Sequence, residues 1–245
     1  MELDNKKLYE SDEVVAKYSS NSTRLRSLNN AEKNFIDKFD IKNKKVLVIG
    51  SGAGRVPVNL LLFGNVVVGV DRSKKLVEFA RSTFPNEKFK DLTFVEADAE
   101  NMDSVPDESF DVVYFAMNTI DYIDSIEHRQ RVLIEAKKKI KIGGILAFSS
   151  HNSKAYFLSP KVRIKDKHFK YLFVKYVFAQ ESVVGGGTIF KGDPDYIIEQ
   201  TFKLGGLKYQ GFVCDSRSNI DRFISRKLLF SKFYFPYIVY VFIKE

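Results

Sequence analysis

The chain has 245 residues, of which 44% are hydrophobic and 29% charged, and its formal net charge is +8. This length suits one large domain, or one domain with an insertion. The single cysteine, Cys214, excludes an internal disulfide, and no cysteine–histidine cluster suggests a metal site. Because the N-terminus is charged and no apolar run could span a bilayer, we expect a cytoplasmic protein without a transmembrane segment. The positive charge reflects either a lysine-rich composition or an acidic partner.

The first hundred or so residues alternate between amphipathic segments and short apolar runs. A helix is expected over 27–40, with Ser27 or Asn29 as its cap, because its apolar residues share one face. Uninterrupted valine-rich runs are typical of parallel strands that are covered on both sides. The expected strands cover 44–50, 65–71 and 92–98, and the helices between them cover 55–64 and 73–84.

The same alternation continues to residue 150. A strand is expected over 109–116 and a helix over 125–140, and a turn at Gly143 and Gly144 then leads into a strand over 144–150. Because parallel strands need crossover helices, the pattern predicts an α/β protein with a doubly wound sheet. After a basic and aromatic segment, the remaining expected elements are a helix over 193–206 and strands over 208–215 and 235–245.

Three glycines directly follow the first predicted strand, in the stretch VLVIGSGAGR: Gly50, Gly52 and Gly54. The missing side chains let a ligand approach the backbone N–H groups at the start of the next helix. A tight bend that binds nothing is the alternative. Asp71 ends the second strand, where a carboxylate can accept hydrogen bonds from both hydroxyls of a ribose. Asp71 could instead cap the following helix, although Ser73 is able to do so.

Two kinds of nucleotide cofactor compete for this turn. A dinucleotide-binding turn usually reads G-x-G-x-x-G, but Arg55 stands at the third glycine position. The stretch instead resembles the first motif of the class I S-adenosylmethionine-dependent methyltransferase family, position by position. The resemblance continues through EADAENM, SFDVVYFAMNTIDYI, GGILAFSS and the closing strands. It implies a Rossmann-like fold with a seven-stranded, mostly parallel sheet and an antiparallel last strand.

The same resemblance implies S-adenosyl-L-methionine as the cofactor. It places Asp71 on the acid that binds the ribose and Asp98 on the acid that receives the adenine amino group, with Ala99 offering its backbone N–H. Tyr18 and Arg24 resemble N-terminal residues that fold over the cofactor. The implied cofactor-binding residues are Gly50, Ser51, Gly52, Gly54, Asp71, Arg72, Asp98, Ala99, Asn118 and Tyr18.

Val48 is a departure from the family, which carries Asp or Glu at this position to orient the amino-acid end of the cofactor. A valine side chain cannot accept a hydrogen bond, so backbone carbonyls, water or other side chains must hold that end. Because the other motifs are intact, this departure favours weaker cofactor binding over loss of activity.

The methyl acceptor is expected near the residues that follow the fourth and fifth strands, because ligands of open α/β sheets bind beyond the carboxyl ends of the strands. His151 is the candidate catalytic residue, since imidazole can take a proton from a hydroxyl or amine near neutral pH; a structural role is the alternative. Asn118 either touches the cofactor or acceptor or closes the turn. The other candidates are Ala116, Met117, Asp121, Tyr122 and Asn152.

We expect a single domain over 1–245 with an insertion over 153–192 that caps the substrate. Residues 154–175 contain seven Lys and Arg but one acid, Asp166, and the basic residues are interleaved with apolar ones. Such a segment could close over an acidic acceptor, or it could be a solvated edge of the sheet. The glycines of 185–188 indicate a hairpin turn.

The favoured function is methyl transfer to an O or N atom of a small molecule or glycan. The stretch FSSHN resembles sequences of methyltransferases associated with bacterial surface polysaccharides. An RNA methyltransferase is an alternative because of the basic, aromatic insertion, although the chain carries no separate RNA-binding module and no N-P-P-Y-type motif. A cofactor-binding protein without catalytic activity is the other alternative.

Overall fold

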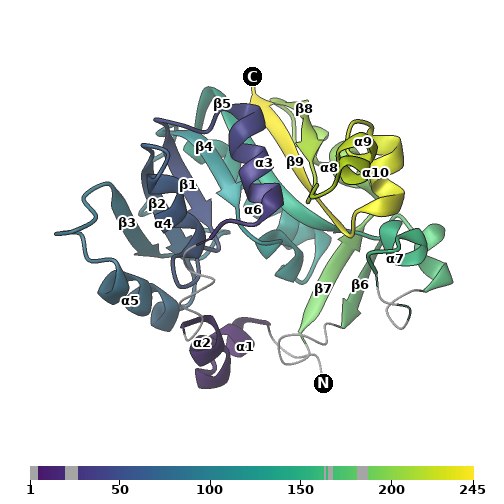
Figure 1. Cartoon of the computed structure of the whole chain (residues 1–245). Coiled ribbons are helices and arrows are strands. Elements are labelled where there is room, and N and C mark those ends of the chain that lie inside the picture. Colours follow the sequence, from purple (N-terminus) through teal and green to yellow (C-terminus); the bar gives the residue numbers. More distant parts are fainter. Residues whose placement is uncertain (1–4, 20–26, 163, 165–167, 181–186) are drawn as a thin grey trace.

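The computed structural model describes residues 5–19, 27–162, 164, 168–180 and 187–245. Within these residues the protein is one sheet of nine strands with helices on both faces (Figure 1). The strands are β1 (Lys45–Ile49), β2 (Val66–Asp71), β3 (Leu92–Glu96), β4 (Phe110–Phe115), β5 (Ile140–Asn152), β6 (Tyr176–Gln180), β7 (Thr188–Gly192), β8 (Leu207–Val213) and β9 (Tyr237–Lys244).

Five parallel strands form the centre of the sheet in the order β3-β2-β1-β4-β5. β9 is antiparallel to both β5 and β8, which confirms the expected antiparallel last strand. The expected number of seven strands is too small, because the segment before residue 193 adds the antiparallel pair β6 and β7. The doubly wound α/β fold is therefore confirmed, with two additional strands.

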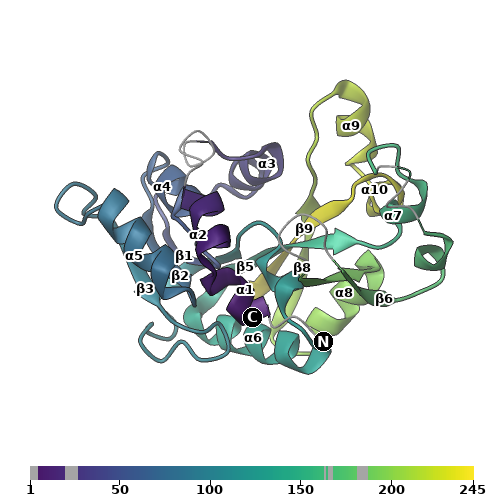
Figure 2. The same cartoon turned by 90° about the horizontal axis from the view of Figure 1, so that it is seen from below.

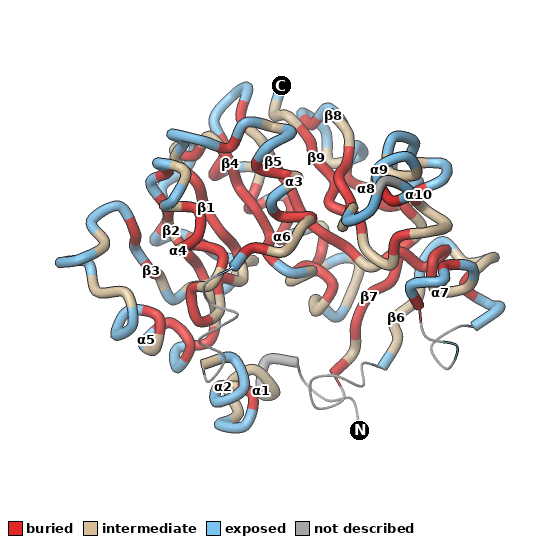
Figure 3. The backbone as a smooth tube through the Cα atoms, viewed as in Figure 1, coloured by how far each residue is buried: buried red, intermediate tan, exposed pale blue. Residues whose placement is uncertain are grey.

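The apolar strands supply a core on each face of the sheet. Leu47 and Ile49 of β1 pack into one hydrophobic cluster, together with residues of the helices over 126–139 and 194–202. Val46 and Val48 pack into the other, together with residues of the helices over 30–39, 55–61 and 74–83. Alternate residues of a strand point to opposite faces, so an uninterrupted apolar run serves both clusters. Figure 3 shows the central strands buried beneath the exposed outer segments.

The helices begin where their capping residues predict. Asn29 caps α3 in a capping box with Glu32, and Ser73 and Ser125 cap α5 and α6 through their side chains. The helices are α1 (Asn5–Glu10), α2 (Asp12–Ser19), α3 (Asn30–Phe39), α4 (Arg55–Leu61), α5 (Lys74–Thr83), α6 (Ile126–Lys139), α7 (Ala155–Leu158), α8 (Pro194–Phe202), α9 (Asn219–Ile224) and α10 (Leu228–Tyr234), with 3-10 turns η1 (Thr119–Tyr122) and η3 (Phe169–Leu172).

The glycine pair Gly143 and Gly144 lies inside β5 and not in a turn before it, since the strand begins at Ile140. Gly143 adopts a positive φ of 76°, and the pairing with β4 shifts register between Phe110 and Val112. A side chain on Gly144 would place its Cβ 2.5 Å from Cγ2 of Ile140. The glycines therefore form an irregularity that lets the strand continue.

The segment that was expected to be an insertion builds outward from the carboxyl end of β5. β7 pairs in parallel with the last residues of β5, at His151 and Asn152, beyond the end of β4. The antiparallel pairing of β6 with β7 agrees with the expected hairpin, but its turn at 185–186 lies outside the described residues. The hairpin thus extends the sheet at the edge where a ligand is expected.

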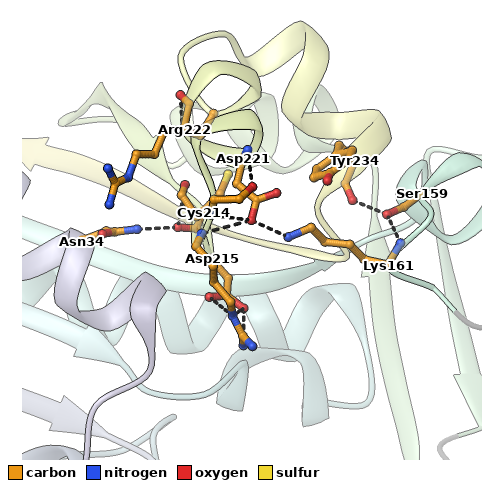
Figure 4. A network of polar contacts seen from close by, with 12 residues as sticks. Asn34, Ser159, Lys161, Cys214, Asp215, Asp221, Arg222 and Tyr234 are labelled. Atoms are coloured by element: carbon orange, nitrogen blue, oxygen red, sulfur yellow. Dashed lines mark hydrogen bonds and ion pairs between the residues drawn. The ribbon is translucent and has the colours of Figure 1, made fainter.

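A second group of elements lies beside this hairpin (Figure 2). We call the described residues of 153–175 and 216–236 the side lobe; it contains α7, η3, α9 and α10. Figure 4 shows the polar network in and next to this lobe, where Lys161 Nζ donates to Asp221 Oδ2 at 3.0 Å. The same oxygen accepts a hydrogen bond from the Arg217 N–H at 3.0 Å. Burial alone would raise the pKa of Asp221, but these hydrogen bonds lower it to about 2. The network fixes α9 against the segment that follows α7.

No helix among the described residues is both long enough and apolar enough to cross a membrane.

Candidate functional site

The glycine turn lies between β1 and α4, at the carboxyl edge of the sheet. Gly50, Gly52 and Gly54 have φ values of 70°, 52° and 93°, which side-chain-bearing residues rarely adopt. A Cβ on Gly50 would lie 2.2 Å from Oγ1 of Thr119, and one on Gly54 would lie 2.9 Å from the ring of Phe94. A Cβ on Gly52 would meet nothing within 4 Å among the described residues. The missing side chain of Gly52 therefore leaves room beside the turn in the described part of the chain, as a ligand-binding turn needs.

Asp71 joins this turn to the second strand. Its Oδ2 accepts a hydrogen bond from the Gly52 N–H at 2.8 Å, and its Oδ1 accepts one from the Ser73 N–H at 3.0 Å. Burial raises the pKa of Asp71, and the two backbone hydrogen bonds oppose that shift. Ser73 caps α5 through its own side chain, which accepts from Leu76 N. Asp71 therefore sets the shape of the glycine turn as well as contacting the start of the next helix.

Other residues predicted to bind the cofactor follow the neighbouring strands β2 and β3. Asp98 follows β3 and is exposed, and its Oδ1 accepts a hydrogen bond from the Glu100 N–H at 3.0 Å. Ala99, the next residue, is partly buried. Arg72, which directly follows β2, is partly buried as well. Val48 is completely buried in the core of β1, so its side chain cannot reach a ligand at the edge.

The N-terminal helices cover this edge (Figures 1 and 2). The carbonyl of Tyr9 accepts a hydrogen bond from Ser73 Oγ at 3.2 Å. Its ring contacts the rings of Tyr18 and Tyr122, with centroids 6.1 and 5.5 Å apart. The pKa of Tyr9 is raised mainly by burial and, to a smaller extent, by the neighbouring Tyr122. Tyr18 thus packs against Tyr9, which is bound to Ser73, and its role toward the cofactor stays a prediction. Arg24 lies outside the described residues.

His151 and Asp121 form a hydrogen-bonded pair at the ends of β5 and β4. Asp121 is fully buried, and its Oδ2 lies 2.8 Å from His151 Nδ1 and accepts the His151 N–H at 2.6 Å. Its Oδ1 accepts a hydrogen bond from Ser150 Oγ at 2.6 Å. Because a carboxylate only accepts, this geometry assigns the ring proton to Nδ1 and makes Nε2 the proton acceptor of the ring, with Asn118 Nδ2 3.5 Å away as a weak donor to it.

Arg129 of α6 supports the same carboxylate from the buried side. Its Nη1 lies 3.2 Å from Asp121 Oδ1 and also donates to the carbonyl of Ile120. The guanidinium stacks over the ring of Phe190 at 3.8 Å from the centroid. Burial lowers the pKa of Arg129, and the charge of Asp121 opposes that shift. The ion pair, the hydroxyl and the backbone together hold Asp121 in one orientation toward His151.

Asn118 occupies strained backbone beside this pair. Met117 and Asn118 both adopt positive φ, 48° and 58°, which costs of order 1–3 kcal/mol per residue. The Asn118 N–H donates to Ser149 Oγ at 2.7 Å, and its Nδ2 lies 3.5 Å from His151 Nε2. Among the described residues, the buried Asn118 Oδ1 has no hydrogen-bond partner, and neither has Ser51 Oγ in the glycine turn. Two buried acceptors without donors suit a site that receives a polar ligand.

The residues present therefore fit S-adenosylmethionine. The glycine turn lets a ligand approach its backbone closely, although the N–H groups of Gly50, Gly52 and Gly54 are already hydrogen-bonded within the chain. A carboxylate at the end of the second strand and another after the third supply acceptors that a ribose and an adenine need. The orphaned oxygens of Ser51 and Asn118 lie on the same edge.

Comparison with known proteins decides the family. A family model described as a methyltransferase domain matches residues 40–201. The chain belongs to this methyltransferase family. The match covers the predicted glycine turn, both aspartates and the fourth and fifth strands, and it confirms the assignment made from the motifs. S-adenosylmethionine is accordingly the cofactor of this methyltransferase.

Similar proteins support the same family. Protein 235L of Invertebrate iridescent virus 6, named as a candidate methyltransferase, is 28% identical over 66% of this chain and 57% of its own length. A ubiquinone biosynthesis O-methyltransferase of Hydrogenovibrio crunogenus is 26% identical over 55% of each chain. The methyltransferase therefore matches about half the length of these relatives.

Solved structures share the fold. The CcbJ methyltransferase of Streptomyces caelestis superimposes with a TM-score of 0.67 at 16% identity, over 98% of this chain and 99% of that one. The glycopeptide N-methyltransferase MtfA in complex with S-adenosyl-L-methionine has a TM-score of 0.64 at 14% identity, over 88% and 93%. These likenesses show the architecture of the methyltransferase and nothing about its acceptor.

The predicted acceptor residues divide into two groups in the structure. Asp121 and His151 meet at the edge, and Asn118 lies beside them. Asn152 instead points away: it is completely buried, and its Nδ2 donates to the carbonyls of Lys232 and Phe235. Asn152 is thus an anchor for the last strand, and its expected place among the acceptor residues is wrong.

Sequence reasoning missed two features of the methyltransferase site. Asp121 was only one of several candidates, and neither its pairing with His151 nor the contribution of Arg129 could be read from their spacing. Tyr9 was missed because the first helices carry no motif. The signal that existed was a lone carboxylate and a lone histidine that follow neighbouring parallel strands, which end at one edge.

Proposed function

We propose that this methyltransferase transfers a methyl group to a hydroxyl of a small molecule or glycan, with His151 as the general base. The observation that carries the proposal is the pair formed by Asp121 and His151. An acceptor hydroxyl must lose its proton as it attacks, whereas many other acceptors need no base. A buried carboxylate that orients a histidine at the proposed cofactor edge therefore suits a hydroxyl acceptor, which needs a base.

The proposed role of each residue follows from its contacts. When bound, S-adenosylmethionine supplies an electrophilic methyl group on a positively charged sulfur. His151 Nε2 would take the proton that the acceptor hydroxyl loses on methylation. The negative charge of Asp121 then stabilises the imidazolium, and Arg129 and Ser150 keep the carboxylate in place. Base catalysis of this kind contributes about 10²–10⁴-fold to the rate.

The cofactor residues are proposed on the same basis. Asp71 would accept hydrogen bonds from the ribose and Asp98 from the adenine amino group, with the N–H of Ala99 beside it. Gly50, Ser51, Gly52 and Gly54 would line the amino-acid end and the ribose, with Arg72, Asn118 and Tyr18 around them. Holding cofactor and acceptor in line is itself worth about 7–11 kcal/mol in favourable cases.

The insertion over 153–192 is proposed as the substrate cap within the single domain. The ring of Tyr156 lies 6.3 Å from that of His151, and Lys191 Nζ lies 3.5 Å from the Tyr156 centroid. These residues place aromatic and basic groups next to the proposed base, which suits an aromatic or acidic acceptor. Lys161 does not contribute, because its ammonium is bound to Asp221 on the side lobe.

The experiment that tests the function is a methyl-transfer screen with labelled S-adenosylmethionine against metabolite and glycan extracts, followed by identification of the labelled product. The proposal expects an O-methylated product that is formed by the native chain and not by Asp71→Ala. A product labelled on nitrogen or on RNA would refute the hydroxyl acceptor. Cofactor binding without labelled product from any extract would favour a non-catalytic role.

A further inference from the structure

Large apolar side chains are exposed on the side lobe far more often than elsewhere in the described part of the chain. Sixteen such side chains are exposed among the described residues, and eight of them belong to the lobe. The other eight each belong to a different element or loop. The lobe members are Leu158, Ile164, Phe169, Phe173, Ile220, Phe223, Leu229 and Phe230. A concentration of this kind indicates an interaction surface, whereas single exposed residues do not.

The two halves of the lobe lie side by side although they are distant in sequence. α7 packs against both η3 and α10, and α10 packs against α9; Figures 1 and 2 show α7 next to α10. The rings of Phe157 and Phe169 meet edge to face with centroids 5.3 Å apart. Ser159 Oγ donates to the carbonyl of Tyr234, and Lys161 binds Asp221. The exposed residues therefore belong to one packed unit and not to separate loops.

The short helices of the lobe present their apolar residues together. Ile220 and Phe223 lie three positions apart on α9, hence on one face, and are 67% and 65% exposed. Leu229 and Phe230 lie in the first turn of α10 and are 61% and 53% exposed. A folded helix normally turns such residues toward the core, so their exposure leaves an apolar face without a partner in the described chain.

Positive charge surrounds these residues. Arg222, Arg226 and Lys227 are exposed on α9 and on the turn into α10. The one acid in residues 219–234 is Asp221, which is buried and bound to Lys161. In the other half, Lys170 and Lys175 are exposed, and the described residues of 153–175 include no acid. The surface is thus both apolar and basic.

We propose that the side lobe docks on the surface of an anionic lipid bilayer. The exposed Phe, Leu and Ile side chains would enter the boundary between headgroups and acyl chains, while the arginines and lysines contact lipid phosphates. The inference is independent of the acceptor that the site methylates. No helix of the described chain could span the membrane, so the attachment is peripheral.

The exposed aliphatic side chains of the side lobe favour a bilayer over a nucleic acid as its binding partner. Aromatic rings and basic groups would serve both, since bases stack on aromatic side chains and phosphates bind Arg and Lys. Half of the exposed set is aliphatic, and such side chains neither stack on bases nor bind phosphate. They do partition into the acyl boundary of a membrane. The four aliphatic members are Leu158, Ile164, Ile220 and Leu229.

The test is co-sedimentation of the full chain with vesicles of phosphatidylcholine alone and of phosphatidylcholine mixed with phosphatidylglycerol. The proposal expects binding to the mixed vesicles that weakens with added salt, and little binding to the neutral ones. The variant Leu229→Ser with Phe230→Ser should lose most of the binding, and Arg226→Glu with Lys227→Glu should lose it too. The matched control Phe202→Ser removes a residue that is 64% exposed on α8, outside the lobe, and should bind as the native chain does.

A fluorescence measurement keeps the test independent of folding defects. The chain contains no tryptophan, so Phe230→Trp introduces a single reporter, and Phe202→Trp serves as its control. Mixed vesicles should shift the emission of the first variant to the blue and leave the second unchanged. Absence of binding to the mixed vesicles, equal binding by the lobe variants with native circular dichroism, or binding to RNA in place of vesicles would overturn the proposal.

Discussion

Asp121 accepts two hydrogen bonds from His151, one from the backbone N–H at 2.6 Å and one from ring Nδ1 at 2.8 Å. The two contacts fix both the position of the histidine and its tautomer. Since Arg129 and Ser150 hold the same carboxylate, the ring has little freedom to turn. The proposed base is therefore oriented before any substrate arrives.

The first prediction concerns His151. His151→Ala should lower kcat by about 10²–10⁴-fold, because it removes the proton acceptor, and should leave cofactor affinity within error of the native value. Turnover assays and calorimetry with S-adenosylmethionine measure the two effects. His128→Ala is the control, since His128 is half-exposed on α6 and pairs with Glu100, outside the network of Asp121. Undiminished turnover would eliminate His151 as the base.

The second prediction concerns Asp121. Asp121→Asn leaves the buried Arg129 without its counter-charge, so the free energy of unfolding should fall by about 3–5 kcal/mol. The remaining folded protein should also turn over more slowly, because an amide no longer stabilises the imidazolium. Denaturant unfolding and kcat of the folded fraction measure these effects. Asp124→Asn changes a side chain that is 70% exposed and should do neither. Native stability of Asp121→Asn would argue against the ion pair.

The third prediction separates backbone strain from ligand binding. Gly52→Ala and Gly205→Ala both force alanine into positive φ, 52° and 71°, where the added Cβ meets nothing within 4 Å in the described chain. Each should lose about 1–2 kcal/mol of stability. Only Gly52→Ala should also lose cofactor binding in calorimetry, because its Cβ enters the proposed site. Equal cofactor affinity of the two variants would remove the glycine turn from the site.

The fourth prediction concerns pH and the side lobe. The pKa of Asp221 is about 2, below its usual value of 3.8, so its stabilising contribution is complete above that usual value and is lost as pH falls toward 2. Asp221→Asn should cost about 1.5–3 kcal/mol at pH 7 and less at pH 3, as measured by urea unfolding. Asp37→Asn, exposed on α3, should cost nothing at either pH. If the difference in unfolding free energy between the native chain and Asp221→Asn does not change with pH, the role of the carboxylate is contradicted.

Local sequence signals predicted the central sheet well. Each valine-rich run became a strand, and Asn29, Ser73 and Ser125 began the helices that their side chains cap. These predictions succeed because strand alternation and helix capping depend on residues close together in sequence. The extent of β5 was mispredicted because Gly143 and Gly144 look like a turn, and only pairing with β4 shows that the strand continues through them.

The sequence predicted where the site lies, at the carboxyl edge of the sheet, but not which side chains contact one another there. Asp71 and His151 could be placed beyond strand ends because parallel strands end together. The contacts of Asp121 with Arg129 and Ser150 depend on how α6 packs below the sheet, and no short-range pattern encodes that. Similarly, the pairing of Lys161 with Asp221 joins residues 60 positions apart, which turned an expected lid residue into a structural one.

A crystal structure with bound S-adenosylhomocysteine tests the central claim most directly. The account predicts that the ribose hydroxyls bind Asp71, that the adenine lies beside Asp98 and Ala99, and that the sulfur faces the side on which His151 Nε2 lies. A ribose held away from Asp71, or a sulfur turned away from His151, would contradict it.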